Sequence, residues 1–515
     1  MLAQVLSGAV HGVDPFVVRI DVNLASGLPS FAVVGLAQGA VREGRERVTA
    51  ALRNTGFELP LKRTTVNLSP ADVRKEGAAF DLPIAVGILL ACGALPPLDA
   101  ERHAFLGELG LDGSLRPVSG VLPVAARCRE AGVETLVVPE ENAREAAVVG
   151  GLRVLGARTL AAVVGHLTGS APLARTVVDV DALLRNGPRD GLDLRDVKGQ
   201  AAAKRALEIA AAGSHNLLLV GPPGAGKTMI ARRLTGILPR MTLAEALEST
   251  RVHSVAGNLR DGGALVTERP FRAPHHTVSD AGLVGGGCPL RPGEMSLAHN
   301  GVLFLDELAE YRRNVLEVLR QPLEEGTVRL SRARGAARFP ARFLLVAAMN
   351  PCPCGYAGDG TDRCGCDPAV VARYQGRVSG PLLDRIDLHL HVPPVPYRLL
   401  ESDRDDPSSE EVRERVARAR ALQERRFAGA ADVHANGHMR PADVRRWCRP
   451  EPAAASLLRA AVERAGLSAR AYDRVLKVAR TVADLEGSPT IRRVHVAEAL
   501  QYRSLDRTLG AHPPD

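Results

Sequence analysis

A glycine-rich loop constrains this chain more than any other feature of its sequence. The apolar run Asn216-Leu-Leu-Leu-Val220 leads into Gly221-Pro-Pro-Gly-Ala-Gly-Lys227-Thr228, and a helix-compatible segment follows. In such a loop, backbone N–H groups surround phosphates, the lysine reaches the β- and γ-phosphates, and the threonine hydroxyl binds Mg²⁺. The sequence therefore predicts a strand, a nucleotide-binding loop and a helix, and the loop residues are Gly221, Pro222, Pro223, Gly224, Ala225, Gly226, Lys227 and Thr228.

A second motif supplies the carboxylates that hydrolysis of a nucleoside triphosphate needs. Gly301-Val-Leu-Phe-Leu-Asp306-Glu307 is an apolar strand that ends in two acids. We expect Asp306 to hold Mg²⁺ through water and Glu307 to orient or deprotonate the attacking water. Strands ending in acids are common, so the assignment depends on the pairing with the glycine-rich loop. The predicted cofactors are ATP and Mg²⁺, with Thr228 and Asp306 as the metal ligands.

Three polar residues further along the chain are candidates for the same site. Asn350 ends the apolar run 343–349, where an amide would position the attacking water. Arg385 lies among apolar residues and is suited to reach the γ-phosphate of a neighbouring subunit. Arg470 begins a helical segment near the C-terminus. A satisfied amide or a surface ion pair is the alternative for each of them, taken alone.

The 515 residues predict about three domains. Residues 1–168 combine short strands and helices in a mixed α/β unit, and residues 169–192, rich in Pro, Gly and charge, form a linker. Residues 193–398 alternate apolar strands with helices, which predicts a doubly wound parallel sheet with ligands at the carboxyl ends of its strands. Residues 408–508 have a helical period.

No segment indicates a membrane protein or a secreted one. Residues 82–98 form the longest apolar run, but prolines and glycines interrupt it, so we expect buried core. The N-terminus lacks a positively charged start and a cleavage pattern. We therefore expect a cytoplasmic protein without a membrane partner.

The order of these motifs resembles that of the AAA+ ATPases. Four further segments resemble the magnesium-chelatase-like ComM/YifB (competence protein ComM) family over nearly the whole chain: Arg272-Ala-Pro-His-His-Thr277, Gly293-Glu-Met-Ser-Leu-Ala-His-Asn-Gly301, Asn350-Pro-Cys-Pro-Cys-Gly355 and Ser379-Gly-Pro-Leu-Leu-Asp-Arg-Ile-Asp387. His275 and His276 within the first of them are expected to be structural.

The resemblance implies an AAA+ sheet followed by a helical lid, assembled into a homo-hexameric ring. It further implies that Arg385 acts in trans as an arginine finger and that Arg470 is the second sensor, with Arg474 as the alternative one turn later. For function, it implies a DNA helicase that promotes branch migration in homologous recombination and natural transformation.

Two other functions remain open. The first is a magnesium-chelatase-like motor subunit that remodels a metal-insertion complex, against which we count the additional first domain. The second is a protein-remodelling ATPase, for which the sequence lacks a convincing aromatic pore loop.

Charge and composition are compatible with a DNA partner. The net charge is +8, and only 3% of the residues are aromatic, so contacts would run from arginine to phosphate rather than through base stacking. The segment 326–339 has strand, turn and strand character, and a solvated basic hairpin is its alternative interpretation. Its candidate DNA-binding residues are Arg329, Arg332, Arg334 and Arg338.

Two cysteine pairs lie close together between Asn350 and Arg385. Four thiolates can close a tetrahedral zinc site. Each pair has only one intervening residue, which is tighter than the usual spacing, so a loop of reduced thiols without metal is the alternative. The candidate zinc ligands are Cys352, Cys354, Cys364 and Cys366.

The first domain resembles the proteolytic domain of Lon, a ribosomal S5 domain 2-like α/β fold, in residues 43–52, 65–74 and 107–120. Such a protease needs a serine nucleophile activated by a lysine. Alignment on that motif places Ala79 at the serine position and Leu122 at the lysine position. We therefore expect no peptidase activity and interpret the domain as a scaffold or a substrate-binding collar.

Overall fold

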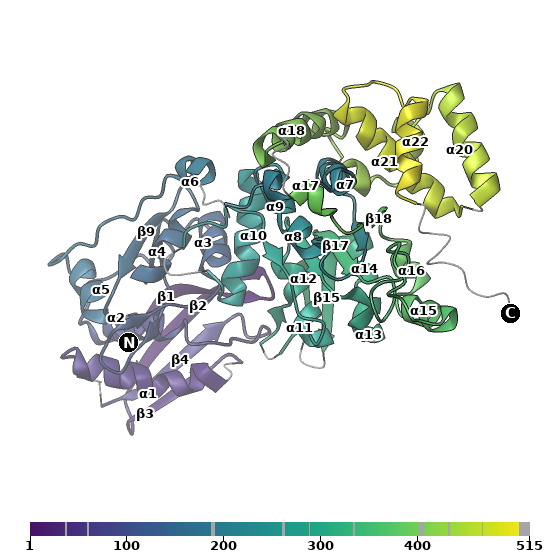
Figure 1. Cartoon of the computed structure of the whole chain (residues 1–515). Coiled ribbons are helices and arrows are strands. Elements are labelled where there is room, and N and C mark those ends of the chain that lie inside the picture. The colour runs from purple at the N-terminus through teal and green to yellow at the C-terminus, as the bar shows by residue number, and fades with distance from the viewer. Residues whose placement is uncertain are drawn as a thin grey trace.

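A computed structural model of the chain describes residues 1–36, 39–58, 61–186, 191–259, 263–287, 289–332, 335–400, 406–430, 433–465 and 467–503. Three parts follow one another along the molecule, with an α/β domain at one end, the α/β core in the middle and a set of helices at the other end (Figure 1). The expected fold class, a parallel α/β core followed by a helical region, is confirmed.

The first domain is built on a seven-stranded mixed sheet of order β3-β4-β2-β1-β5-β8-β9. Its long central strands β1 and β2 are antiparallel, whereas β5, β8 and β9 run parallel to β1. The strands are β1 (Leu2–His11), β2 (Asp14–Ala25), β3 (Ser30–Val34), β4 (Arg63–Ser69), β5 (His103–Phe105), β8 (Thr135–Pro139) and β9 (Arg153–Ala157), with β6 (Glu108–Leu109) and β7 (Leu115–Arg116) in a small hairpin.

Helices cover this sheet on both faces, and a separate apolar cluster lies on each face. They are α1 (Gly39–Asn54), α2 (Asp81–Cys92), α3 (Val121–Glu130), α4 (Glu140–Ala147) and α5 (Leu160–Leu167). Helix α2 is buried along almost its whole length, so the expectation of core for the longest apolar run is confirmed. Among the described residues, no helix has the length and apolarity needed to cross a bilayer.

The predicted linker is more than a plain connection. It contains α6 (Val180–Asn186), and Val178, Val180 and Leu183 pack against the core of the first domain. The backbone at Arg175 also pairs with Leu155 of β9. These apolar contacts attach residues 175–186 to the first domain, and the surrounding proline and glycine concealed that pattern in the sequence.

The core contains a five-stranded sheet of order β11-β14-β17-β10-β18, in which every neighbouring pair is parallel. Alternate residues of β10 (Leu217–Val220) enter different apolar clusters, Leu217 and Leu219 on one face and Leu218 and Val220 on the other. Both faces are therefore covered by helices, as predicted. The strands are β10 (Leu217–Val220), β11 (Phe271–Arg272), β14 (Val302–Leu305), β17 (Leu344–Met349) and β18 (Leu388–His391).

Short helices and two hairpins surround this sheet. The helical elements are η1 (Leu194–Asp196), α7 (Ala201–Gly213), α8 (Lys227–Arg232), α9 (Leu234–Ile237), α10 (Leu243–Ala256), α11 (Asp280–Val284), α12 (Glu294–Leu297), η2 (Leu308–Glu310), α13 (Arg313–Glu317), α14 (Arg320–Glu325), α15 (Pro368–Gln375), α16 (Gly380–Leu383) and α17 (Tyr397–Leu400). The hairpins pair β12 (Gly285–Gly286) with β13 (Arg291–Pro292) and β15 (Thr327–Arg332) with β16 (Gly335–Pro340).

The C-terminal lid consists of α18 (Ser409–Arg426), η3 (Asn436–His438), α19 (Pro441–Trp447), α20 (Pro452–Ala465), α21 (Ala469–Leu485) and α22 (Arg493–Gln501). Helices α18 and α21 pack on α7 of the core, and their apolar residues join its core cluster. A buried ion pair between Arg426 and Asp484 connects α18 to α21. The predicted helical character of this region is confirmed.

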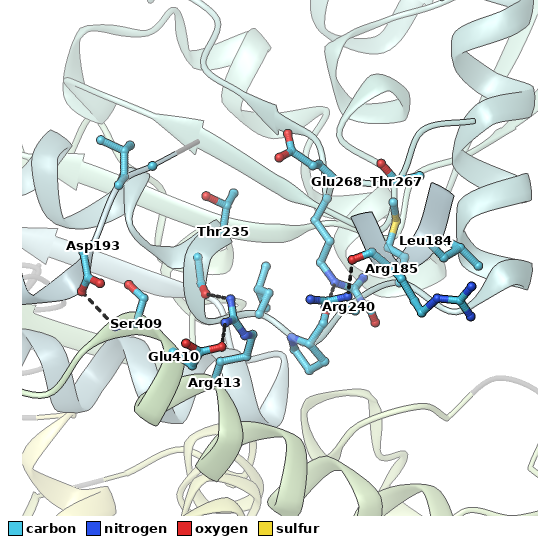
Figure 2. A pocket seen from close by; sticks show the side chains of 17 residues that line it. Leu184, Arg185, Asp193, Thr235, Arg240, Thr267, Glu268, Ser409, Glu410 and Arg413 are labelled. Atoms are coloured by element: carbon cyan, nitrogen blue, oxygen red, sulfur yellow. Dashed lines mark hydrogen bonds and ion pairs between the residues drawn. The ribbon is translucent and has the colours of Figure 1, made fainter. Parts of the chain in front are cut away.

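The linker, the core and the lid meet at one junction (Figure 2). Asp193 accepts a hydrogen bond from the backbone N–H of Ser409 (2.9 Å), and the Ser409 hydroxyl accepts one from the N–H of Leu194 (2.8 Å). Arg413 donates to the carbonyl oxygen of Gly236 (3.0 Å). These contacts fix the start of the lid against the segment that enters the core.

The first domain also contacts the core directly. Gly120, which precedes α3, donates its N–H to the carbonyl oxygen of Ser254 on α10 (3.1 Å), and the Ser254 hydroxyl donates to the buried carboxylate of Glu145. On another surface, the β1–β2 turn lies against the β15–β16 hairpin, where a ring nitrogen of His11 is 2.9 Å from the carbonyl oxygen of Ala336. The first domain and the core are therefore in contact at both of these surfaces.

Candidate nucleotide site

The glycine-rich loop, the two acids and Asn350 meet at one edge of the core sheet. The loop follows β10 directly, Asp306 follows β14, and Asn350 follows β17. These three strands are adjacent and parallel, so their carboxyl ends share an edge. The structure therefore brings these sequence-predicted residues together at one edge of the sheet.

Hydrogen bonds connect the motifs directly. The Lys227 amine donates to the carbonyl oxygens of Gly221 (2.6 Å) and Pro222 (3.0 Å) and to Oδ1 of Asn350 (3.0 Å). The Thr228 hydroxyl donates to Oδ2 of Asp306 (2.6 Å). The two predicted Mg²⁺ ligands therefore lie side by side, which is the arrangement that the metal needs.

The loop backbone explains its glycines. Gly224 and Gly226 have φ angles of 79° and 86°, in the left-handed region that glycine adopts without strain. A Cβ on Gly221 would lie 2.2 Å from the carbonyl oxygen of Val392, so no larger residue fits there. Burial lowers the pKa of Lys227 from its usual value, and the charges of Asp306 and Glu307 oppose that shift. The loop, Lys227, Thr228 and Asp306 fit a nucleotide with Mg²⁺.

Glu307 is held in an unusual position. Its φ angle of 53° is left-handed, which is uncommon outside glycine and is found preferentially at functional sites. Its Oε2 lies 3.1 Å from Nδ1 of His276. His276 follows β11, the strand next to β14 in the sheet. The His276 ring lies beside those of His275 and Tyr311. From the sequence we expected His276 to be structural, and no local pattern indicated that it faces Glu307.

The predicted arginine finger and sensor lie at the opposite edge of the sheet. The Arg385 carbonyl oxygen accepts from Asn216 (2.9 Å), the residue before β10, so Arg385 is near the amino end of that strand. Arg470 lies 4.0 Å from Asp384, next to Arg385. Since a four-residue strand spans about 13 Å, neither arginine reaches the glycine-rich loop of its own chain.

The three arginines at this edge differ in their surroundings. The Arg385 side chain is 10% exposed and forms an ion pair with Glu324, a partner that the sequence did not indicate. Arg474 is 15% exposed and lies 3.7 Å from Asp387, whereas Arg470 is 66% exposed. All three line a cavity with Lys477 and Arg440. The exposed Arg470 is thus better placed than Arg474 to meet an incoming anion.

The hairpin arginines are only partly described. Arg329 and Arg338 are paired across the β15–β16 hairpin and are exposed, while Val328, Leu330, Ala337 and Phe339 are buried in the core. Arg329 also forms an ion pair with Glu325 (3.2 Å). Arg334 and the side chain of Arg332 lie outside the described residues. The prediction of two strands in this segment is confirmed, and residues 333–334, where the turn was predicted, lie outside the described residues.

The four predicted zinc ligands come together in one cluster, in which all four sulfur atoms lie within 4.8 Å of one another.

The first domain has a cavity beside the position of the missing protease nucleophile. Ala79, Val121, Glu108 and Arg291 are among the residues that line it. Leu122 is buried, and the buried Lys75 donates to the carbonyl oxygen of Pro70. Ser69 accepts from Asn67 (3.2 Å), and within the described part of the chain no hydrogen bond joins it to Lys75.

Comparisons with known proteins cover all three parts of the chain. Residues 20–142 match the family described as "Subunit ChlI of Mg-chelatase", residues 193–400 match "Magnesium chelatase, subunit ChlI", and residues 406–503 match "Magnesium chelatase, subunit ChlI C-terminal". The competence protein ComM of Haemophilus influenzae is 47% identical over 511 residues, which are 99% of this chain and 98% of that protein.

Two further relatives are similar to the chain over very different lengths. YifB of Escherichia coli is 43% identical over 509 residues, 99% of this chain and 98% of that protein. The magnesium-chelatase 38 kDa subunit of Acidiphilium rubrum is 28% identical over 180 residues, 30% of this chain and 51% of that protein.

Proposed function

Because the chain belongs to the magnesium-chelatase-like ComM/YifB family of AAA+ proteins, we propose that it is an ATP-driven ring motor that acts on DNA. Its specific activity would be branch migration during homologous recombination, including the integration of DNA in natural transformation. The observation that supports ATP-driven activity is that Lys227, Thr228, Asp306 and Asn350 meet at one edge of the sheet.

The proposed hydrolysis assigns a task to each of these residues. The loop N–H groups and Lys227 bind the β- and γ-phosphates. Thr228 and Asp306 would hold Mg²⁺, which would supply positive charge to the phosphate oxygens. Glu307 takes a proton from the attacking water, and Asn350 orients the water.

A ring is proposed because one chain does not complete the site. Arg385 and Arg470 lie at the amino end of β10, whereas the phosphates bind at its carboxyl end. In a homo-hexamer, these arginines would face the nucleotide of the neighbouring subunit, where they stabilise the charge of the transition state.

DNA is proposed as the partner for two reasons. The relative that is 47% identical over nearly the full length is named a competence protein. The net charge of +8 and the exposed pair Arg329 and Arg338 suit a polyanion. We expect the motor to work in the cytoplasm, without a membrane partner and without peptidase activity, and a zinc ion on the four cysteines would be structural.

A chelatase motor subunit is the second candidate. The family descriptions name a chelatase subunit even for residues 20–142, so the first domain does not exclude this function by itself. The named chelatase relatives cover only 30% of the chain, whereas ComM and YifB cover 99%. Coverage therefore favours the DNA motor, and the same coverage favours it over a general protein remodeller.

The test compares ATP turnover with and without forked or four-way DNA, alongside a strand-exchange assay. We expect DNA to stimulate turnover and labelled strands to be exchanged, and Lys227→Ala to abolish both. Absence of DNA binding and of stimulation would refute the DNA motor. Stimulation by a porphyrin-binding partner instead would support the chelatase function.

A further inference from the structure

The cysteine cluster has the dimensions of a metal site rather than of a disulfide. The Sγ atom of Cys352 is 3.3 Å from that of Cys354 and 3.8 Å from that of Cys364, and Cys354 and Cys364 are 3.7 Å apart. A disulfide needs about 2.0 Å. In a tetrahedral zinc site with Zn–S bonds of about 2.3 Å, the sulfurs lie about 3.8 Å apart.

The surroundings of the cluster also suit thiolates. The backbone N–H of Ala357 points at Sγ of Cys352 (3.3 Å), and such hydrogen bonds stabilise metal-bound sulfur. Cys352 is buried and the other three cysteines are half-buried, so the site is close to the surface and open to metal loading. Four soft thiolate ligands gathered within 4.8 Å of one another favour zinc among the common divalent metals.

The cluster adjoins the nucleotide site. Cys352 lies two residues after Asn350, whose side chain contacts Lys227. Gly355, between the two cysteine pairs, packs against Pro223 of the glycine-rich loop so closely that a Cβ there would lie 2.5 Å from Cδ of the proline. Gln375 of α15 holds the start of the segment through the carbonyl oxygen of Pro351 (2.9 Å).

From these contacts we propose that Cys352, Cys354, Cys364 and Cys366 bind one zinc ion, which holds Gly355 against Pro223 and Asn350 beside Lys227. The metal is structural, because its four ligands leave no position for water or substrate. Loss of the metal releases the segment from the loop and weakens nucleotide binding and turnover. The effect on nucleotide binding and turnover rests on the proposed ATPase activity, whereas zinc binding does not.

The metal is tested on the full-length protein purified without chelators. We expect about one zinc per chain by elemental analysis, and little in Cys354→Ser or Cys366→Ser. Cys92→Ala, outside the cluster, is the control that keeps its zinc. Wild-type protein without zinc, protein that holds iron instead, or Cys366→Ser with full zinc would overturn the site.

The proposed support of the glycine-rich loop by the zinc-bound segment, here called the brace, is tested with a pair of glycine variants that keep the cysteines. Gly355 and Gly360 have φ angles of 88° and 80°, but a Cβ at Gly360 meets no atom within 4 Å. We expect Gly355→Ala to raise the Kd of a nucleotide about fivefold or more while zinc is retained, and Gly360→Ala to leave that Kd nearly unchanged.

A second measurement follows zinc release by an organomercurial with a metal-binding dye. We expect ATP turnover to fall in step with released zinc and to return when thiol and zinc are added back. Zinc release at constant nucleotide affinity and turnover, or equal effects of the two glycine variants, would overturn the brace. Lys227→Ala separates the two proposals, since it should lack turnover and keep its zinc.

Discussion

The two edges of the core sheet carry different functional residues. At the carboxyl edge, Lys227, Thr228, Asp306 and Asn350 contact one another within a single chain. At the amino edge, Arg385 and Arg470 lie together near acids of their own chain, a strand's length away from any phosphate-binding loop. Binding of nucleotide is thus a property that one chain can possess alone, whereas efficient hydrolysis should need two.

The largest expected effect removes the base at the carboxyl edge. Glu307→Gln should lower turnover about 10²–10⁴-fold and leave nucleotide binding intact, because the amide keeps the shape but does not accept a proton. Glu310→Gln, an exposed neighbour paired with Arg377, is the control. ATP turnover and nucleotide affinity are the measurements, and unchanged turnover in Glu307→Gln would contradict the assignment.

The next effect concerns the amino edge. Arg385→Ala should lower turnover about 10²–10³-fold, the usual loss when one donor to a transition-state anion is removed. Mixing Arg385→Ala with Glu307→Gln subunits should restore part of the turnover, because some interfaces then combine an intact acid with an intact arginine. If no mixture recovers activity, the division of the site between two chains is wrong.

Arg470 and Arg474 should respond in opposite ways. Arg470→Ala, at an exposed side chain, should lower turnover about 10–10²-fold with little change in stability. Arg474→Ala should instead destabilise the lid by about 1–3 kcal/mol, since it leaves the buried Asp387 without that partner. Thermal unfolding and turnover distinguish them, and the reverse pattern would make Arg474 the sensor.

The smallest of these effects tests the hold on Glu307. His276→Ala should lower turnover about tenfold, roughly the value of one charge-assisted hydrogen bond, with unchanged nucleotide affinity. His275→Ala is the matched control, because it removes the ring that lies beside His276 and hydrogen-bonds to Thr277. Equal turnover in the two variants would show that the contact between His276 and Glu307 has no role in hydrolysis.

The sequence predicted those features of the site that depend on short segments of the chain. Lys227, Asp306 and Asn350 each follow an apolar run, and parallel strands bring their ends together, so the carboxyl edge could be derived from local patterns. The pairs His276–Glu307 and Arg385–Glu324 could not, since each joins residues from elements whose relative register no local pattern encodes. The packing of α6 on the first domain was missed because its few apolar residues lie in a polar context.

The contact between the β1–β2 turn and the β15–β16 hairpin gives the molecule a mechanical continuity. Gly12 sits so close to Ala337 that a Cβ on the glycine would lie 2.9 Å from that of the alanine, and the rear face of the hairpin is embedded in the core. The hairpin therefore contacts both the core and the first domain. If DNA binds its exposed arginines as proposed, any force on the hairpin would be transmitted to both the core and the first domain.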